Sequence, residues 1–265
     1  MWGLDPITIA ILGIIFIFVM TALGSATVFC FKNVMSNMTK RIFLGFAAGV
    51  MTAASIWGLL NPAIAQAESM GITGWIPAAI GFAAGGIFML LLDMILPHLH
   101  IGSDKPEGLR SSTKRSTMLL FAMTLHNVPE GLAVGLAFGA ALTNGSALAL
   151  GSAVGLALGI GIQNLPEGAA VSLPLKEEIL SAKKAFLLGS LSGIVEPIFA
   201  VVGILLAGAL TMAMPWLLAF AAGAMIYVVV EELIPEAQLG SHSNIGTIAV
   251  MVGFILMMIL DIALG

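Results

Sequence analysis

Long runs of apolar residues, each close to 20 residues in length, follow one another along almost the whole chain. A helix needs about 20 residues to cross the roughly 30 Å hydrocarbon core of a bilayer. Because lipid offers no partner to backbone polar groups, such runs must form helices rather than open strands. The pattern therefore predicts an all-α membrane protein with eight transmembrane helices, near residues 7–30, 42–62, 75–97, 117–141, 147–173, 184–210, 215–235 and 245–264.

The basic residues indicate which way these spans run. All ten Lys and Arg residues lie in the odd-numbered connections, which follow the first, third and fifth spans. They are Lys32, Lys40, Arg41, Lys105, Arg110, Lys114, Arg115, Lys176, Lys183 and Lys184. Since cytoplasmic loops carry the excess of Lys and Arg, these connections are expected in the cytoplasm and both termini outside it.

Composition narrows the class of protein further. Only 9% of the residues are charged and 59% are hydrophobic, with a mean hydropathy of +1.09, whereas soluble domains carry about 25% charged residues. This excludes a soluble domain and predicts one multi-pass membrane domain over residues 1–265. The net charge of −4 gives no sign of a nucleic-acid partner, and the single cysteine, Cys30, excludes an internal disulfide. The first apolar segment is expected to be a retained span rather than a signal peptide.

Two similar polar motifs interrupt the apolar pattern, "HNVPEG" at residues 126–131 and "QNLPEG" at residues 163–168. On a helix, His126, Asn127 and Glu130 share a face because they are three or four residues apart. The second motif supplies Gln163, Asn164, Pro166 and Glu167 in the same order. Pro129 and Pro166 each free a backbone carbonyl and favour a kink. Because the fourth and fifth spans run in opposite directions, the motifs are expected to meet as an inverted pair of broken helices near the membrane midplane.

Glycines at every fourth position accompany both motifs. Gly131, Gly135 and Gly139 belong to the fourth span, and Gly151, Gly155 and Gly159 belong to the fifth. Small residues at this spacing let helix backbones approach closely. The fourth and fifth spans are therefore expected to pack against each other through these glycines.

The donor groups of the two motifs point to a divalent metal. A charge at mid-bilayer costs at least about 2.5 kcal/mol, so buried carboxylates mark ion or substrate paths. Glu196, beside Pro197 in the sixth span, adds a third carboxylate and a third expected distortion. Imidazole with carboxylates suits zinc and other first-row dications, with Cd(II) as a further candidate. Magnesium or calcium would use an all-oxygen site.

Two other classes of protein are alternatives to metal transport. An intramembrane metalloprotease would need an "HExxH" motif, which the sequence lacks, so no enzyme activity and no catalytic cofactor are expected. A transporter or channel for another ion, or for an ion-coupled solute, remains the alternative. It leaves the buried imidazole of His126 unexplained.

The motifs "HNVPEG", "QNLPEG", "EPIFA" and "EELIPEA" resemble the signature of the ZRT/IRT-like (ZIP) transporters, especially their bacterial branch. The resemblance extends over all eight spans and implies a location in the plasma (inner) membrane. It implies carriage of Zn(II), with Fe(II), Mn(II) and Cd(II) as further candidates, into the cytoplasm, and a carrier that forms a homodimer. It also implies an intramembrane two-metal site whose ligands are His126, Asn127, Glu130, Gln163, Asn164, Glu167 and Glu196.

The same resemblance implies a route out of this site. A cytoplasmic exit would be formed by Asp93, His98, His100, Glu231 and Glu232, although the histidines could equally be solvated loop residues. Asp261, near the outer end of the last span, is either a cation-attracting entrance or an ordinary acid at a helix end. The sequence departs from the family pattern in having no long histidine-rich loop between the third and fourth spans, and Gln163 in place of a second motif histidine.

Overall fold

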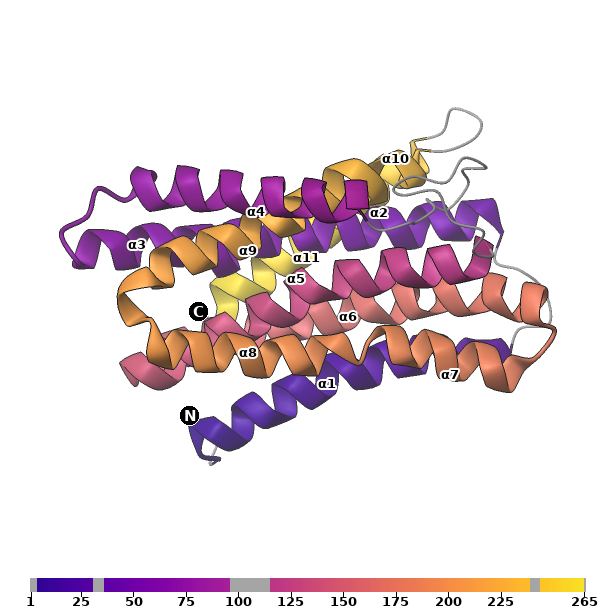
Figure 1. The fold of residues 1–265 in the computed structure, drawn as a ribbon, viewed down its shortest axis with the longest axis horizontal. Helices are drawn as coiled ribbons and strands as arrows, with labels where there is room; N and C mark the ends of the chain where they lie inside the picture. The colour runs from indigo at the N-terminus through magenta and orange to yellow at the C-terminus, as the bar shows by residue number, and fades with distance from the viewer. Residues whose placement is uncertain (1–3, 31–35, 96–114, 239–243, 265) are drawn as a thin grey trace.

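The computed structural model describes residues 4–30, 36–95, 115–238 and 244–264, and the elements in this part of the chain are helices (Figure 1). The first four predicted spans correspond to α1 (Pro6–Ala26), to α2 (Asn37–Ala53) with η2 (Ala54–Leu60) and α3 (Asn61–Ser69), to α4 (Trp75–Ile95), and to α5 (Arg115–Asn144). The last four correspond to α6 (Ala147–Ile179), to α7 (Ala182–Ser192) with α8 (Val195–Ala209), to α9 (Met214–Val228) with η4 (Val229–Leu233) and α10 (Ile234–Ala237), and to α11 (Ile245–Leu264). The short 3₁₀-helices η1 (Thr27–Phe29) and η3 (Thr211–Ala213) complete the described elements.

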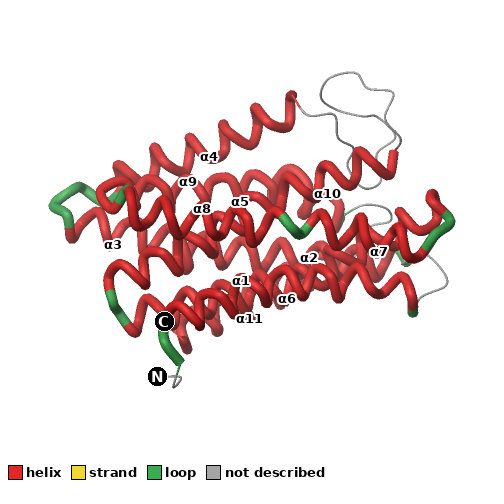
Figure 2. Tube along the Cα trace, turned by 60° about the horizontal axis from the view of Figure 1, so that its bottom comes forward, coloured by secondary structure: helices red, strands yellow, loops and turns green. Residues whose placement is uncertain are grey.

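The number and course of the helices agree with a multi-pass membrane protein. Among the described residues, seven helical segments are long and apolar enough to cross a bilayer. The helix α5, with 30 residues, stands at the place of the fourth predicted span. Figure 1 shows both chain ends at the same end of the bundle, as an even number of crossings requires. The helices run lengthwise in Figure 2, so the prediction of an all-α transmembrane bundle is confirmed.

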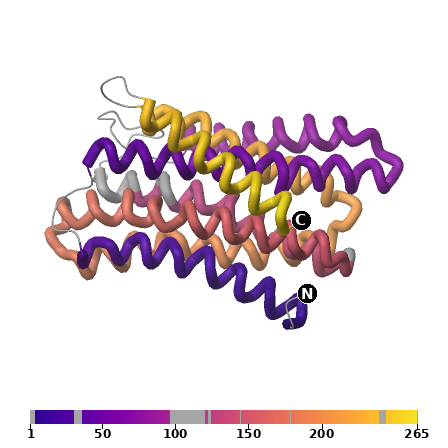
Figure 3. The backbone as a smooth tube through the Cα atoms, turned by 180° about the vertical axis from the view of Figure 1, so that it is seen from behind, coloured from indigo at the N-terminus to yellow at the C-terminus, as the bar shows by residue number. Residues whose placement is uncertain are grey.

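Four helix pairs make the most extensive contacts: α1 with α6, α5 with α8, α2 with α11, and α4 with α9. The helix α11 crosses the others obliquely in Figure 3 and also contacts α6. In each pair, glycines on both helices lie against the partner's backbone. These reciprocal glycines are Gly24 and Gly168, Gly135 and Gly203, Gly49 and Gly253, and Gly85 and Gly223. Small residues at these crossings allow the close backbone approach that drives helix association in lipid.

The helices α5 and α6 contact each other, as predicted, but the prediction that the glycine stripes create this packing is wrong. A Cβ added to Gly135 would stand 2.1 Å from the carbonyl oxygen of Ala200 on α8, and Gly131 lies against the backbone of Glu196. On α6, Gly159 lies against Met257 of α11. The spacing of the glycines correctly indicates close packing, but it does not identify the partner helix.

The helices are distorted at specific places. The sixth span is interrupted between Ser192 and Val195, just before Glu196, which confirms the expected distortion there. In contrast, α5 and α6 each continue as one helix through Pro129 and Pro166, so the kinks that these prolines favour stay a prediction. The second and seventh spans contain the π-helical segments η2 and η4. Such segments are rare and frequently lie at functional sites, and η4 carries Glu231 and Glu232.

Candidate metal site

The two motifs and Glu196 come together in the interior of the bundle. The helix α5 supplies the first motif, α6 the second, and the first turn of α8 supplies Glu196. All seven predicted ligands are buried, with at most 4% of their surface exposed: His126, Asn127, Glu130, Gln163, Asn164, Glu167 and Glu196. Buried polar side chains in such number are costly unless they have partners or bind an ion.

A hydrogen bond between side chains links the two motifs directly. The amide Nε2 of Gln163 donates to Oε1 of Glu130 at 2.8 Å, which joins α6 to α5. The charges of Glu167 and Glu196 act on Glu130, and that of Glu232 acts on Glu167, so these acids lie near one another. The inverted pairing of the motifs is therefore present, although the glycine stripes do not create it.

Glu196 is held by donors from two other helices. Its Oε2 accepts a hydrogen bond from Nδ2 of Asn164 on α6 at 2.7 Å, and its Oε1 accepts one from the hydroxyl of Thr21 on α1 at 2.8 Å. The amide of Asn127 donates to the carbonyl of Ser192 at 3.0 Å, at the interruption before α8. Thr21 was not predicted from the sequence, because a lone threonine in an apolar span carries no signal of its role.

The imidazole of His126 contacts the seventh span. Its Nε2 is hydrogen-bonded to the Oε1 atom of Glu232 on η4. A carboxylate accepts hydrogen bonds, so this contact favours the tautomer with the proton on Nε2. Glu232 was expected in the cytoplasmic exit, but it is mostly buried and touches a residue of the central site.

Several potential ligand atoms in the site have no hydrogen-bond partner among the described residues. They are Nδ1 of His126, Oε2 of Glu130, Oε1 of Gln163 and Oδ1 of Asn164. Each is a buried atom that carries a lone pair, and a buried polar atom without a partner costs about 1–3 kcal/mol. An imidazole nitrogen, a carboxylate oxygen and two amide oxygens together form a donor set that a dication can use.

Carboxylates and imidazoles alone do not form a ready-made cluster. Among the described residues, no group of three His, Cys, Asp or Glu side chains is already arranged to hold a metal ion. Two amide groups donate to the acids: the nitrogen of Gln163 faces Glu130, and that of Asn164 faces Glu196. Metal binding would therefore require these amides to turn and present their oxygens.

The predicted exit residues are partly described. Asp93 on α4 accepts a hydrogen bond from the hydroxyl of Tyr227 on α9 at 3.1 Å. The charges of Asp93, Glu231 and Glu232 all act on Tyr227, so these acids lie in its neighbourhood. Glu231 is exposed, in contrast to Glu232. His98 and His100 lie outside the described residues.

Asp261, the predicted entrance, lies in the outer part of α11 and is 6% exposed. Its Oδ2 has no hydrogen-bond partner among the described residues. Its backbone lies near Gly155 of α6, where an added Cβ would stand 3.7 Å from the Cα of Asp261. This acid is thus packed inside the bundle against a helix of the site, and it is not an ordinary exposed acid at a helix end.

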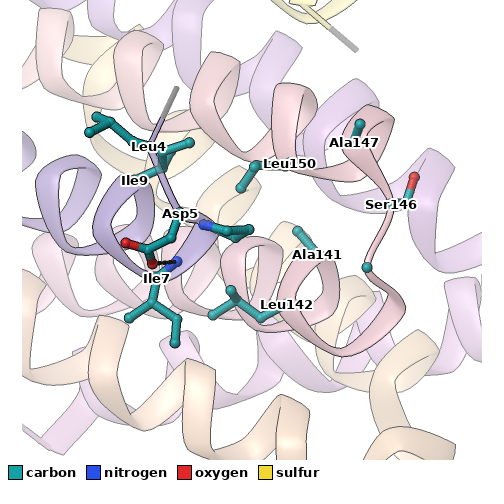
Figure 4. Close-up of a pocket in the computed structure, with 11 residues that line it drawn as sticks. Leu4, Asp5, Ile7, Ile9, Ala141, Leu142, Ser146, Ala147 and Leu150 are labelled. Atoms are coloured by element: carbon teal, nitrogen blue, oxygen red, sulfur yellow. Dashed lines mark hydrogen bonds between the residues drawn. The ribbon is translucent and has the colours of Figure 1, made fainter. Parts of the chain in front are cut away.

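A pocket of about 490 Å³ opens at the outer end of the bundle, between the start of α1 and the turn from α5 to α6 (Figure 4). Its acid, Asp5, caps α1 by accepting hydrogen bonds from the backbone N–H groups of Ile7 and Thr8 at 3.0 Å. The hydroxyl of Thr8 also donates to Asp5, and this bond lowers the pKa of that carboxyl. Asp5 therefore stabilises the start of α1, and none of the seven predicted ligands lines the pocket.

Comparison with known proteins gives consistent matches over nearly the full length. A family model described as ZIP Zinc transporter matches residues 100–261. The chain is 39% identical to the human zinc transporter ZIP11, over 97% of each protein. It is 38% identical to the zinc transporter GufA of Myxococcus xanthus, over 92% of this chain and 94% of that protein. It is also 38% identical to the zinc transporter ZIPB of Bordetella bronchiseptica, over 94% of this chain and 79% of that protein.

Proposed function

Because the chain belongs to the ZIP zinc transporter family, we propose that it carries Zn(II) across the plasma membrane into the cytoplasm. Cd(II), Fe(II) and Mn(II) are further candidate cargoes, since the same nitrogen and oxygen donors suit them. The metal is a substrate that passes through the protein rather than a resident cofactor. The inward direction is what the resemblance to this family implies, and the basic residues assign the end of the bundle away from both termini to the cytoplasm.

The observation that carries this proposal is the set of lone pairs inside the bundle. Four buried ligand atoms of His126, Glu130, Gln163 and Asn164 lack hydrogen-bond partners among the described residues. Zn(II) commonly takes four ligands at about 2.0–2.2 Å. Glu167, Glu196 and Asn127 bring the number of buried donor side chains to seven. This number suffices for two ions when Glu130 and Glu167 bridge them.

The amide side chains can present either of two atoms to the carboxylates. The nitrogens of Gln163 and Asn164 donate to Glu130 and Glu196. Rotation of each amide by half a turn would place its oxygen there instead, where it could bind a cation together with the carboxylate. Both oxygens would then face the cation, which is the orientation that a ligand needs.

Zinc flux into liposomes tests the proposed function. Purified protein is reconstituted into liposomes that contain a zinc-sensitive dye, and Zn(II) is added outside. The proposal predicts a protein-dependent rise in the dye signal that exceeds the signal with Mg(II), read by a magnesium-sensitive dye in parallel liposomes. Equal signals with and without protein would contradict it.

The contact between Glu232 and His126 predicts that Glu232 orients the imidazole for metal binding. Its contact with Nε2 of His126 leaves Nδ1 free to bind metal, and carboxylates that orient a metal-binding histidine raise metal affinity about 10–100-fold. The substitution Glu232→Ala is therefore expected to raise the half-saturating zinc concentration for flux by at least about tenfold. Glu177→Ala, at an exposed position near the cytoplasmic end of α6, is the control and should leave this concentration unchanged. An unchanged half-saturating concentration in Glu232→Ala would count against the orienting role.

A further inference from the structure

We propose that Thr21, on α1, is a positioning residue that holds the Glu196 carboxylate in the orientation that binds metal. The proposal rests on the proposed function, because it takes Glu196 as a metal ligand. It assigns a role at the metal site to the first span, which contributes none of the seven predicted ligands.

The hydroxyl of Thr21 has two possible acceptors, and their distances differ. Its Oγ1 lies 2.8 Å from Oε1 of Glu196 and 3.3 Å from the backbone oxygen of Ile17. A hydroxyl has one proton to donate, and hydrogen bonds to carboxylates are the shorter and stronger ones. The carboxylate of Glu196 is therefore the principal partner of Thr21.

Other threonines in the helices behave differently. A threonine inside a helix commonly bonds to the carbonyl four residues earlier. Thr52, Thr124 and Thr143 do so, with distances of 2.6, 2.7 and 2.8 Å to Ala48, Leu120 and Gly139. Thr21 departs from this pattern because its equivalent contact is longer and its shorter contact reaches another helix. This difference separates a residue that serves Glu196 from one that only satisfies its own helix.

The second oxygen of Glu196 has its own donor. Nδ2 of Asn164 lies 2.7 Å from Oε2, so one donor from α1 and one from α6 act on the two oxygens. These two bonds fix the plane of the carboxylate, while each oxygen keeps a lone pair that can bind metal. When the Asn164 amide turns its oxygen to the cation, the bond from Thr21 is the one that continues to orient Glu196. A group that orients a ligand in this way raises its affinity for metal without touching the ion.

The surrounding backbone leaves Thr21 little freedom to move away. A Cβ added to Gly193, at the interruption before α8, would stand 2.9 Å from the Cβ of Thr21 and 3.1 Å from Oε1 of Glu196. A Cβ added to Gly168 of α6 would stand 2.3 Å from the carbonyl oxygen of Thr21. Thr21 is 3% exposed. The α6 helix and the junction of α7 with α8 thus both pack closely against Thr21, and this packing keeps its hydroxyl near Glu196.

The test compares Thr21→Val, which keeps the shape but removes the donor, with Thr21→Ser, which keeps the donor. Zinc flux into dye-loaded liposomes is measured over a range of zinc concentrations, with Thr143→Val as a matched control. We expect Thr21→Val to raise the half-saturating concentration about tenfold while the maximal rate changes much less. Thr21→Ser and Thr143→Val should resemble the wild type. The added methyl group of Gly193→Ala would push Thr21 away from Glu196, so this variant should also raise the half-saturating concentration.

Three outcomes would overturn the proposal. Thr21→Val could have the half-saturating concentration of the wild type, or Thr21→Ser could be as impaired as Thr21→Val, which would indicate a role in packing alone. If Thr21→Val does not fold, a Gly193→Ala variant with the half-saturating concentration of the wild type would overturn the proposal instead. In each case the wild type and Thr143→Val still carry zinc, whereas absence of flux in the wild type would instead contradict the proposed function.

Discussion

The substitutions Glu130→Gln and Glu167→Gln should each reduce zinc flux to the level of protein-free liposomes. Both carboxylates are buried in the interior, Glu130 with 0% and Glu167 with 4% of its surface exposed. The variants keep the size of the side chain and remove the charge that offsets the cation. Loss of a residue that only orients a ligand weakens metal binding about 10–100-fold, so loss of either proposed bridging ligand should weaken it at least as much. The measurement is the initial rate of dye response at a fixed zinc concentration.

A matched control separates this effect from a change of net charge. Glu68, at the end of α3, is exposed and distant in sequence from both motifs. The substitution Glu68→Gln removes one negative charge, as the site variants do, and should leave zinc flux unchanged. Unimpaired flux in both site variants, or an equal loss in Glu68→Gln, would contradict a role of the two motif glutamates in metal transport.

The substitution Gly135→Ala should destabilise the protein and impair transport together. The added Cβ would stand 2.1 Å from the carbonyl oxygen and 2.6 Å from the Cα of Ala200, and neither backbone atom can move without shifting α8. Overpacking of this kind typically costs about 1–3 kcal/mol of unfolding free energy. Since α8 also carries Glu196, the same displacement should move this ligand away from α5. Thermal unfolding in detergent and zinc flux measure the two effects.

Gly208, which lies on the partner helix α8, provides the control. No atom lies within 4 Å of the position where its Cβ would be. Alanine is more favourable than glycine inside a helix by about 1 kcal/mol, so Gly208→Ala should unfold at the same temperature or slightly higher. If Gly135→Ala and Gly208→Ala unfold alike, the close contact between α5 and α8 does not determine stability.

The sequence predicts the bundle and the central motifs because both depend on local patterns. The length of each apolar run determines a span. The spacing of three and four residues puts His126, Asn127 and Glu130 on one face of a helix, and the antiparallel course of α5 and α6 brings the second motif beside it. The hydrogen bond between Gln163 and Glu130 is the structural counterpart of that prediction.

Features that depend on partners far away in the chain could not be predicted in this way. Glycine spacing indicates that a helix packs closely, but the choice of α8 over α6 as the partner of Gly135 depends on the whole arrangement of helices. Thr21 could satisfy its hydroxyl within its own helix, so nothing local points to Glu196. The π-helical segment η4 changes the helical register, and the face occupied by Glu232 therefore cannot be read from a 3.6-residue period.

The location of zinc in the protein tests the central claim most directly. Crystals grown with Zn(II) would show the ion by its anomalous scattering at the zinc absorption edge. The account predicts a peak between α5, α6 and α8, with carboxylate oxygens of Glu130 and Glu167 at about 2.0–2.2 Å and an imidazole nitrogen of His126 at about 2.0–2.1 Å. Strong peaks elsewhere in the bundle, with none between these three helices in zinc-saturated crystals, would contradict it.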